Sequence, residues 1–244
     1  MASVGIVGLG AYLPPRKMTN EDWEGIVDTS DEWISTKTGM KVRRIAEDDV
    51  CTSDLAVDAC KRALGDAGLE ASDVDMVILA TSSPDVPLSS TAGIVQYKLG
   101  CSNCAAFDIN AVCAGWVNAL DVGGRYAGSP GYRNVLVVGS EVYSRILNWQ
   151  DRGTCVLFGD GAGAAVLSEV EEGRGVLGSW LMSDGSGSSV IEIPAGGVRT
   201  PWDSDGFEDG MQYFQMDGRA VWDFAVEAFP QAVRSVLDLS LIHI

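Results

Sequence analysis

Apolar and polar positions alternate in blocks through most of the chain, with short apolar runs separated by stretches that carry a helical stripe. Apolar residues three or four positions apart predict amphipathic helices, one with Thr52 or Ser53 as its N-cap and one over Thr91 to Leu99. This alternation predicts an α/β fold with a mostly parallel sheet that is buried on both faces. The apolar runs predict buried strands at Val4 to Leu9, Met76 to Ala80, Ala105 to Val112 and Val135 to Gly139.

The chain after residue 155 carries a glycine-rich run and then less regular signals. Glycines alternate from Gly159 to Gly163, but no Lys-Ser or Lys-Thr pair follows them, so they do not predict a phosphate loop. We interpret them as a close backbone approach between strands or to a ligand, ahead of a strand at Ala165 to Leu167. A further strand is predicted at Val176 to Met182, and an amphipathic helix at Asp217 to Leu237 that Pro230 should kink.

The charge of the chain argues against two classes of partner. Its 17 Lys and Arg stand against 34 Asp and Glu, which gives a formal net charge of −17. Nucleic acid and an anionic membrane surface would be repelled, and an acidic carrier protein would need a local basic patch that this total conceals. No apolar run reaches the roughly 18 residues of a membrane span, and the N-terminus lacks the pattern of a signal peptide. We therefore expect a cytoplasmic protein with no membrane association.

The 6 cysteines predict free thiols in a reduced compartment, because no secretory signal accompanies them. Cys101 and Cys104 form a single CxxC pair, and the only histidine, His243, lies near the end of the chain. A zinc site needs a second pair or histidines, so we predict no metal. Cys60 and Cys155 lie in apolar surroundings and are predicted to be core residues.

Cys113 is the candidate nucleophile. It follows the apolar run ending at Val112, and the residues after it show the stripe of a half-buried helix, so we predict that Cys113 is the first helical residue. Unpaired N–H groups and the helix dipole favour a negative charge there, which stabilises a thiolate that can attack a carbonyl carbon. From these residues alone, a small buried apolar cysteine is the alternative interpretation.

A second candidate site lies near a predicted helix start at Asp28 to Ile34. An exposed Trp33 beside Lys37 could stack on a flat ring and pair with a phosphate. The same pattern also fits a surface tryptophan that packs on the preceding helix, and the residues leave both interpretations open.

Seven separated motifs, in order and nearly without gaps, resemble β-ketoacyl-[acyl-carrier-protein] synthase III, the condensing enzyme that initiates type II fatty acid synthesis. They are Gly10-Ala11-Tyr12-Leu13-Pro14, Thr19-Asn20, Thr29-Ser30-Asp31-Glu32-Trp33-Ile34, Thr38-Gly39, Phe107-Asp108 with Ala111-Val112-Cys113-Ala114-Gly115, Asp151-Arg152-Gly153-Thr154, and Phe158-Gly159-Asp160-Gly161-Ala162-Gly163-Ala164, and Met216-Asp217-Gly218 fits as well.

The resemblance implies a thiolase-like fold with layers α-β-α-β-α and mixed, mostly parallel five-stranded sheets. It implies a complete first half at residues 1–170 and an incomplete second half at residues 171–244, usually in a homodimer. The chemistry that it implies starts with attack of Cys113 on an acyl-CoA, typically acetyl-CoA. The acyl group then condenses with malonyl-carrier protein, made reactive by decarboxylation, to give a 3-ketoacyl product. Acyl-CoA is a substrate here, and no cofactor is implied.

By position, the resemblance places Trp33 on the CoA adenine and Arg152 on the adenine or the CoA phosphates. Lys37 stands where the family usually has arginine, which keeps the charge but loses the planar fork of donors. Leu88 falls in the region that closes the acyl pocket of the partner subunit.

The sequence departs from the family in its last part. The family's His-Gln-Ala-Asn segment and a later asparagine, which support the decarboxylation and the oxyanion, are absent, and His243 is a poor substitute. We therefore expect a prematurely ended family member that acylates Cys113 without condensation and exposes apolar surface. Two alternatives are a related condensing enzyme of polyketide or quinolone synthesis and a non-catalytic subunit that pairs with a complete thiolase-fold partner.

Overall fold

The computed structural model describes residues 3–240, which form two compact units. The first unit takes the chain up to Arg16, then Arg44–Val142 and Gly159–Ser179. The second takes Lys17–Arg43, Tyr143–Phe158 and the chain from Trp180 onward. The predicted division into residues 1–170 and residues 171–244 concerns something different, the two α/β halves that the family resemblance implies. It stays a prediction.

A five-stranded sheet in the order β1-β7-β6-β4-β5 forms the centre of the first unit. β4 runs parallel to both β5 and β6, whereas β7 runs antiparallel to both β1 and β6. The sheet is therefore mixed, and the parallel part lies where the strand and helix alternation is strictest. Its strands are β1 (Val4–Tyr12), β4 (Met76–Ala80), β5 (Ala105–Ile109), β6 (Val135–Val142) and β7 (Asp160–Glu169).

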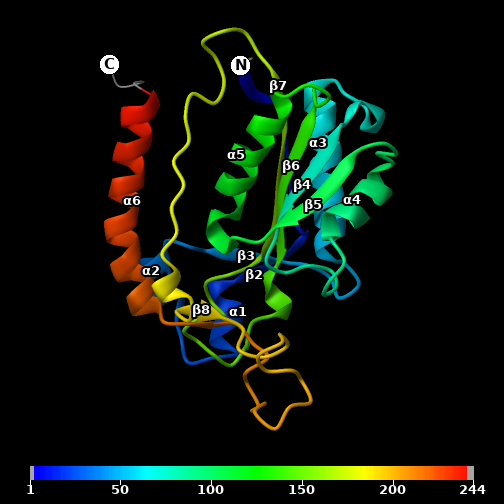
Figure 1. Ribbon diagram of the computed structural model, residues 1–244. Helices are drawn as coiled ribbons and strands as arrows, with labels where there is room; N and C mark the ends of the chain where they lie inside the picture. The colour runs from blue at the N-terminus through cyan, green and yellow to red at the C-terminus, as the bar shows by residue number, and fades with distance from the viewer. Residues whose placement is uncertain (1–2, 241–244) are drawn as a thin grey trace. The chain divides into compact units, whose positions relative to one another are not determined.

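Helices cover both faces of this sheet (Figure 1). α3 (Thr52–Ala67) and α4 (Thr91–Leu99) lie on one face, and α5 (Gly115–Ala127) lies on the other. Two apolar clusters fill the layers, one between α3 and the sheet and one between α5 and the sheet. Cys60 is fully buried in the first cluster, as its sequence position predicts. Short 3₁₀ turns occur at Ala71–Asp73 and Val112–Ala114.

Glycines let the helices approach the sheet closely. A Cβ atom on Gly10 of β1 would collide with the carbonyl oxygen of Ala59 in α3. On the opposite face, a Cβ on Gly123 of α5 would come within 2.7 Å of a Val137 methyl group. These positions therefore favour glycine for space rather than for backbone freedom.

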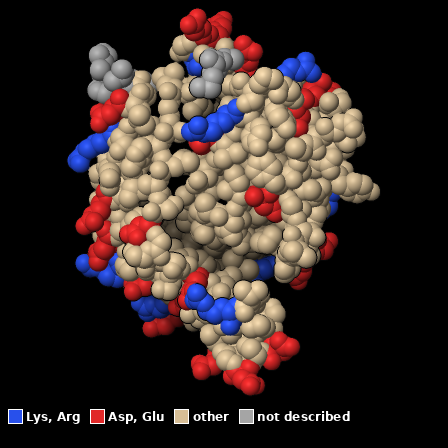
Figure 2. Space-filling model, viewed as in Figure 1, with Lys and Arg blue, Asp and Glu red and all other residues tan. Residues whose placement is uncertain are grey.

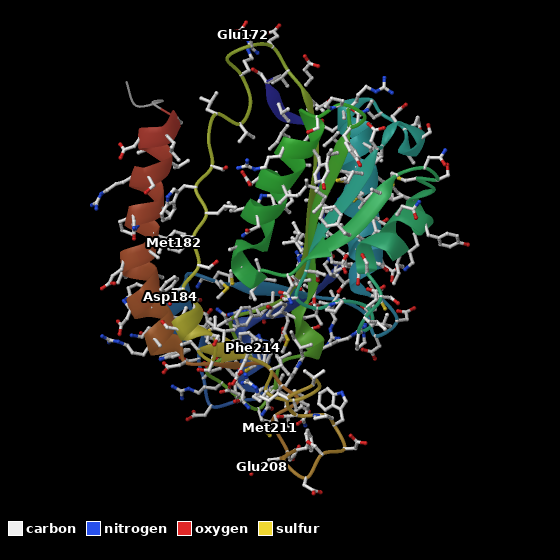
Figure 3. The ribbon with its side chains drawn as sticks, viewed as in Figure 1. Glu172, Met182, Asp184, Glu208, Met211 and Phe214 are labelled. Carbon is white, nitrogen blue, oxygen red and sulfur yellow. The ribbon has the colours of Figure 1, made fainter. Side chains whose placement is uncertain are left out.

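The second unit contains short elements and one long helix. Its core includes Tyr143, Leu147 and Phe214, and the Phe214 side chain is labelled in Figure 3. The Phe158 ring packs on Phe214 with ring centroids 5.1 Å apart. The elements, including two short strands at the unit boundary, are β2 (Arg16–Thr19), α1 (Asn20–Glu24), α2 (Asp31–Thr38), β3 (Val42–Ile45), 3₁₀ turns at Tyr143–Arg145 and Gly185–Gly187, β8 (Ile191–Glu192), β9 (Gln215–Met216) and α6 (Gly218–Ser240).

Several sequence predictions need correction. The strand predicted at Val176 to Met182 is absent: the segment is irregular and largely exposed, and a single bond from the Val176 N–H to the Val4 carbonyl of β1 at 2.8 Å does not extend into a ladder. Cys51, not Thr52 or Ser53, is the N-cap of α3, because the Thr52 hydroxyl instead donates to the Ser83 carbonyl at 2.6 Å. The strand predicted to reach Val112 ends at Ile109.

α6 continues through Pro230 as one helix of 23 residues and buries none of them. Its exposed apolar side chains include Trp222, Phe224 and Phe229. This agrees with the expectation that the chain exposes apolar surface. Among the described residues, no helix has the length and apolar character needed to cross a membrane.

Charged side chains are mixed on the face shown in Figure 2. Lys and Arg lie among Asp and Glu there, without gathering into one basic patch. The overall balance is strongly acidic, with a formal net charge of −17.

Candidate active site

Cys113 lies in the connection between β5 and α5, and its side chain is exposed. The prediction that it is the first helical residue is wrong by a short margin. Val112–Ala114 forms a 3₁₀ turn, in which the Ala114 N–H donates to the Ala111 carbonyl at 3.0 Å, and α5 begins at Gly115. The thiol therefore lies one turn ahead of the α-helix, close to the helix start that favours negative charge.

Val112, directly before the thiol, adopts a left-handed backbone conformation with φ of 46°. A β-branched residue rarely takes this conformation, and such residues concentrate at functional sites where the surrounding structure imposes the strain. The conformation turns the chain between β5 and α5, so the Cys113 side chain stays on the surface while Gly115 is buried.

The start of α5 rests directly on the sheet. A Cβ on Gly115 would come within 3.2 Å of the Ala80 methyl group, at the carboxyl end of β4. Gly139 of β6 leaves room in the same way for the Trp116 ring, which a Cβ there would meet at 3.4 Å. The backbone that carries Cys113 is thus held close to the carboxyl ends of two parallel strands, where ligands of open α/β sheets bind.

Glu141, in β6, fixes the loop that follows β4. Its carboxylate accepts hydrogen bonds from the Ser82 N–H at 2.9 Å and the Ser83 N–H at 3.0 Å, and from the Ser83 hydroxyl. The Thr81 N–H donates to the Ile109 carbonyl at 3.2 Å, which ties the same loop to β5. These bonds stiffen the edge of the sheet on which the Cys113 turn rests.

Asp108 of β5 caps the neighbouring helix. Its carboxylate accepts from the N–H groups of Thr91 and Ala92, both at 2.7 Å, and from the Ser90 hydroxyl at 2.9 Å. A carboxylate at this helix end satisfies donors that have no partner within the helix. One strand thus sets both the Cys113 turn and the start of α4.

Leu88 lies just before that capped helix and is fully exposed, at 106% of its reference area. It also has a positive φ of 78°. An apolar side chain held outward by an uncommon backbone conformation is available to another molecule. Its predicted place in the acyl pocket of a partner subunit stays a prediction.

In the second unit, the structure brings Trp33 and Arg152 together. The Arg152 guanidinium carbon lies 5.1 Å from the centroid of the Trp33 ring, within the range of a cation–π contact. Ser30 caps α2 by accepting from the Trp33 N–H at 3.1 Å. The half-buried ring therefore packs beneath a cation from a distant part of the sequence; the resemblance assigned both residues to the CoA site, but no local sequence pattern indicates this contact.

Asp28 holds the other side of Arg152. The guanidinium donates to the Asp28 carbonyl oxygen at 2.8 Å, and the Asp28 carboxylate lies 3.7 Å away. Lys37, one helical turn after Trp33 on α2, is exposed and forms no ion pair among residues 3–240. Aromatic and cationic groups thus gather at one surface of this unit, as a nucleotide would require.

Burial separates four of the other five thiols from Cys113, the exception being the partly exposed Cys51 at the N-cap of α3. Burial raises the pKa of Cys101 to about 12 and that of Cys155 to about 11, and it raises the pKa of Cys60 further still. Burial also raises the pKa of Cys104. These thiols remain protonated at neutral pH, so Cys113 is the better candidate for a nucleophile.

Within the described part of the chain, no group of three or more His, Cys, Asp or Glu side chains is arranged to hold a metal ion. Cys101 and Cys104 contact each other through a weak bond from the Cys104 thiol to the Cys101 carbonyl at 3.6 Å. His243 lies outside the described residues.

Sequence reasoning missed the supporting groups of both sites. A signal existed for Glu141 and Asp108, since each is an acid within a mostly apolar run. No local signal marks Asp28 as a partner of Arg152, because the two are 124 positions apart. Val112 gave the opposite signal, because β-branched residues favour extended strands.

Comparisons with known proteins agree on one family. The family model described as 3-Oxoacyl-[acyl-carrier-protein (ACP)] synthase III matches residues 107–185. A β-ketoacyl-[acyl-carrier-protein] synthase III of Caldanaerobacter subterraneus subsp. tengcongensis is 50% identical over 236 residues, covering 97% of this chain and 71% of the relative. The corresponding protein of Clostridium acetobutylicum is 45% identical over 244 residues, covering 100% of this chain and 74% of its own length.

Solved structures give the same result. The 3-oxoacyl-[acyl-carrier-protein] synthase III of Aquifex aeolicus VF5 superposes with a TM-score of 0.87 at 39% identity, covering 98% of this chain and 72% of that one. The priming β-ketosynthase of the R1128 polyketide pathway superposes with a TM-score of 0.89 at 31% identity, covering 98% and 70%. The predicted thiolase-like α/β fold is therefore confirmed.

Proposed function

Because the chain belongs to the β-ketoacyl-[acyl-carrier-protein] synthase III family of condensing acyltransferases, we propose that Cys113 takes the acyl group from an acyl-CoA. The family acts in fatty acid biosynthesis. One observation carries the proposal: Cys113 is the exposed thiol, set by the strained Val112 at the start of α5. The Cys113 sulfur bonds to the thioester carbon, the bond from that carbon to the CoA sulfur breaks, and CoA leaves as a thiol after taking up a proton.

The start of α5 supports the charges that this step creates. Helix N–H groups without partners and the positive end of the helix dipole stabilise the attacking thiolate. The close packing of Gly115 against Ala80 holds the start of this helix in place. Glu141 adds rigidity by holding the loop after β4. These groups position the nucleophile before the substrate arrives, which lowers the barrier to attack.

Trp33, Lys37 and Arg152 form the proposed CoA nucleotide site. The Trp33 ring offers a flat face for adenine, and Arg152 and Lys37 offer positive charge to the phosphates. The contact of Arg152 with Trp33 at 5.1 Å supports this grouping. Lys37 supplies a single ammonium group, so its phosphate contact is less directional than that of an arginine.

The second substrate in this proposal is malonyl-carrier protein, and the protein works as a cytoplasmic homodimer. β5 is an edge strand of the sheet, so no strand of residues 3–240 pairs with its outer side. The fully exposed Leu88 suits a place in the acyl pocket of a second subunit. The proposal keeps the predicted division into a first half at residues 1–170 and the beginning of a second half at residues 171–244, and it requires no cofactor.

Acylation of the purified chain by radiolabelled acetyl-CoA tests the proposal. One acetyl group per chain should appear on Cys113 by peptide mass spectrometry, and Cys113→Ser should abolish it. Cys104→Ser serves as the matched control and should leave the label in place. Label on another residue, or undiminished label in Cys113→Ser, would show that the assignment is wrong.

A polyketide priming ketosynthase is the second candidate, favoured by the structural match to the R1128 enzyme at a TM-score of 0.89. A profile of acyl-CoA chain lengths and acceptor carrier proteins separates the two. Preference for acetyl-CoA with a fatty acid carrier protein supports the first candidate, and preference for longer acyl groups with a polyketide carrier protein supports the second. A non-catalytic subunit predicts neither activity.

A further inference from the structure

Arg43 is a buried cation without an acidic partner. It is 3% exposed, and no carboxylate pairs with it among residues 3–240. Its guanidinium donates to the side-chain oxygen of Asn20 and to the carbonyl oxygen of Val156, while its Nε has no partner in the described part of the chain. Burying a charge in this way is costly, and an apolar residue would fill the space at lower cost. The arrangement therefore calls for an explanation beyond packing.

Asn20 passes the connection on to α2. It is fully buried, and its amide donates to the Asp31 carboxylate at 2.7 Å and to the Met40 carbonyl at 2.9 Å. Asp31 is the first residue of α2, and Met40 comes just after the Gly39 that ends it. One side chain thus fastens both ends of the helix that carries Trp33 and Lys37.

The bond from Arg43 to Val156 fastens the segment that carries Arg152. Hydrogen bonds within the turn at residues 151–155 link Arg152 closely to Val156. The Cys155 N–H donates to the Asp151 carbonyl at 2.9 Å, and the Gly153 N–H donates to the Asp151 carboxylate at 2.9 Å. A backbone held at Val156 and folded this tightly leaves Arg152 little freedom except in its own side chain.

We propose that Asn20 and Arg43 are positioning residues that hold the Trp33 helix and the Arg152 turn at the spacing needed to bind the CoA nucleotide. The inference rests on the proposed function, because it takes Trp33 and Arg152 as the nucleotide site. Neither Asn20 nor Arg43 touches the nucleotide. They act through α2 and through the turn before Val156, which they join within the second unit.

Asn20→Asp is the sharpest test. The new carboxylate still accepts from Arg43, but it can no longer donate to Asp31 or Met40, so the buried cation keeps its partner while the link to α2 is lost. CoA binding, measured by titration calorimetry, should weaken about tenfold, because a small displacement of Trp33 relative to Arg152 misaligns the groups that contact the nucleotide. Arg43→Lys keeps the charge but cannot span both acceptors, and it should weaken CoA binding in the same way.

A thioester substrate that lacks the nucleotide distinguishes a loss of CoA positioning from a loss of the protein's overall structure. The rate of Cys113 acylation by subsaturating acetyl-CoA should fall by about the same tenfold, whereas the rate with S-acetyl-N-acetylcysteamine should change less than about twofold. Asn134→Asp, an equivalent change at an amide that donates to the Asp73 carbonyl, is the matched control and should alter neither rate.

Each outcome decides the matter. Unchanged CoA binding in Asn20→Asp and Arg43→Lys would overturn this inference and leave the proposed function intact. An equal loss with both thioesters, or unfolding of both variants, would assign the pair a purely structural role. Absence of CoA binding in the unchanged chain would refute the nucleotide site of the proposed function and this inference with it.

Discussion

At Val112, a single backbone angle orients the proposed nucleophile, Cys113, toward the surface. The positive φ of 46° precedes Cys113, and the side chain of Val112 is 41% exposed, so little burial depends on it. We expect Val112→Gly to leave the free energy of unfolding within about 1 kcal/mol, because relief of backbone strain offsets the greater entropy of a glycine chain. Acylation of Cys113 should nevertheless slow about tenfold, since the turn is no longer imposed.

Urea unfolding and the acylation rate measure these two effects separately. Val117→Ala, at an exposed apolar residue in α5, is the control and should preserve the rate. A Val112→Gly chain that acylates as fast as the unchanged protein would show that the strained conformation has no part in positioning the thiol.

In the proposed CoA site, Asp28 competes with the nucleotide for the Arg152 guanidinium. Its carboxylate lies 3.7 Å from the Arg152 guanidinium and is fully exposed. Asp28→Asn should strengthen CoA binding about two- to threefold at low salt, the range of an exposed ion pair, and the gain should shrink as salt screens the charges. Calorimetry at two salt concentrations measures this. Asp203→Asn, an exposed acid elsewhere in the unit, should have no such effect, and weaker binding in Asp28→Asn would contradict the prediction.

The candidate residues differ in how far the sequence indicates them. Cys113 lies where an apolar run and a helical stripe meet, and the ordered motifs around it, rather than this local pattern, favour a nucleophile over a packing cysteine. The contact of Trp33 with Arg152 depends on a fold that joins distant segments, which local patterns do not encode. Asn20 and Arg43 carry no distinctive local signal, because a buried polar pair is recognisable only by its partners.

At the scale of elements, the contact between β1 and α3 depends on the absence of a side chain. A Cβ on Gly10 would meet backbone atoms of Ala59 and Ala63, which cannot move aside easily. We expect Gly10→Ala to lower the free energy of unfolding by about 1–3 kcal/mol. Gly65→Ala, on the open side of α3 with nothing within 4 Å of the new Cβ, should raise it by up to about 1 kcal/mol.

Urea denaturation of both variants gives the comparison. Equal stability changes at the two positions would mean that the close contact between α3 and β1 does not determine the effect of a side chain at Gly10.

Element boundaries were predictable where the apolar pattern was uninterrupted. The predicted strand at Met76 to Ala80 and helix at Thr91 to Leu99 match β4 and α4 residue for residue. The predicted strand at Ala165 to Leu167 covers only part of β7. Glycine and alanine alternate through the first half of β7, where strand structure depends on pairing with β1 and β6. The strand predicted at Val176 to Met182 does not form, because an apolar run needs a neighbouring strand with which to build a hydrogen-bonded ladder.

At the scale of the whole molecule, buried thiols make stability sensitive to alkali. Burial raises the pKa of Cys101 from an ordinary 9.0 to about 12 and that of Cys155 to about 11. The unfolded chain releases these protons above about pH 9, whereas the folded chain retains them. Their stabilising effect is therefore complete below pH 9 and is lost as the pH rises toward 11 and 12.

Urea unfolding between pH 8 and pH 11 tests this linkage. Each such thiol should contribute a decline of up to about 1.4 kcal/mol per pH unit above pH 9. Cys155→Ala should lower stability at pH 8 through lost packing, but its decline above pH 9 should be shallower than that of the unchanged chain. Parallel curves would show that the thiol is not the titrating group.

In the proposed CoA site, the contact between Trp33 and Arg152 also determines how fast the nucleotide enters. An adenine held between them needs about 7 Å, two contact distances of about 3.5 Å, whereas the guanidinium carbon and the ring centroid are 5.1 Å apart. If Asn20 and Arg43 hold the backbone as proposed, only the Arg152 side chain has to swing aside, a movement that takes nanoseconds or less. Stopped-flow tryptophan fluorescence should therefore show one phase, with an observed rate that rises linearly with CoA concentration. A rate that levels off would reveal a slower opening of the backbone.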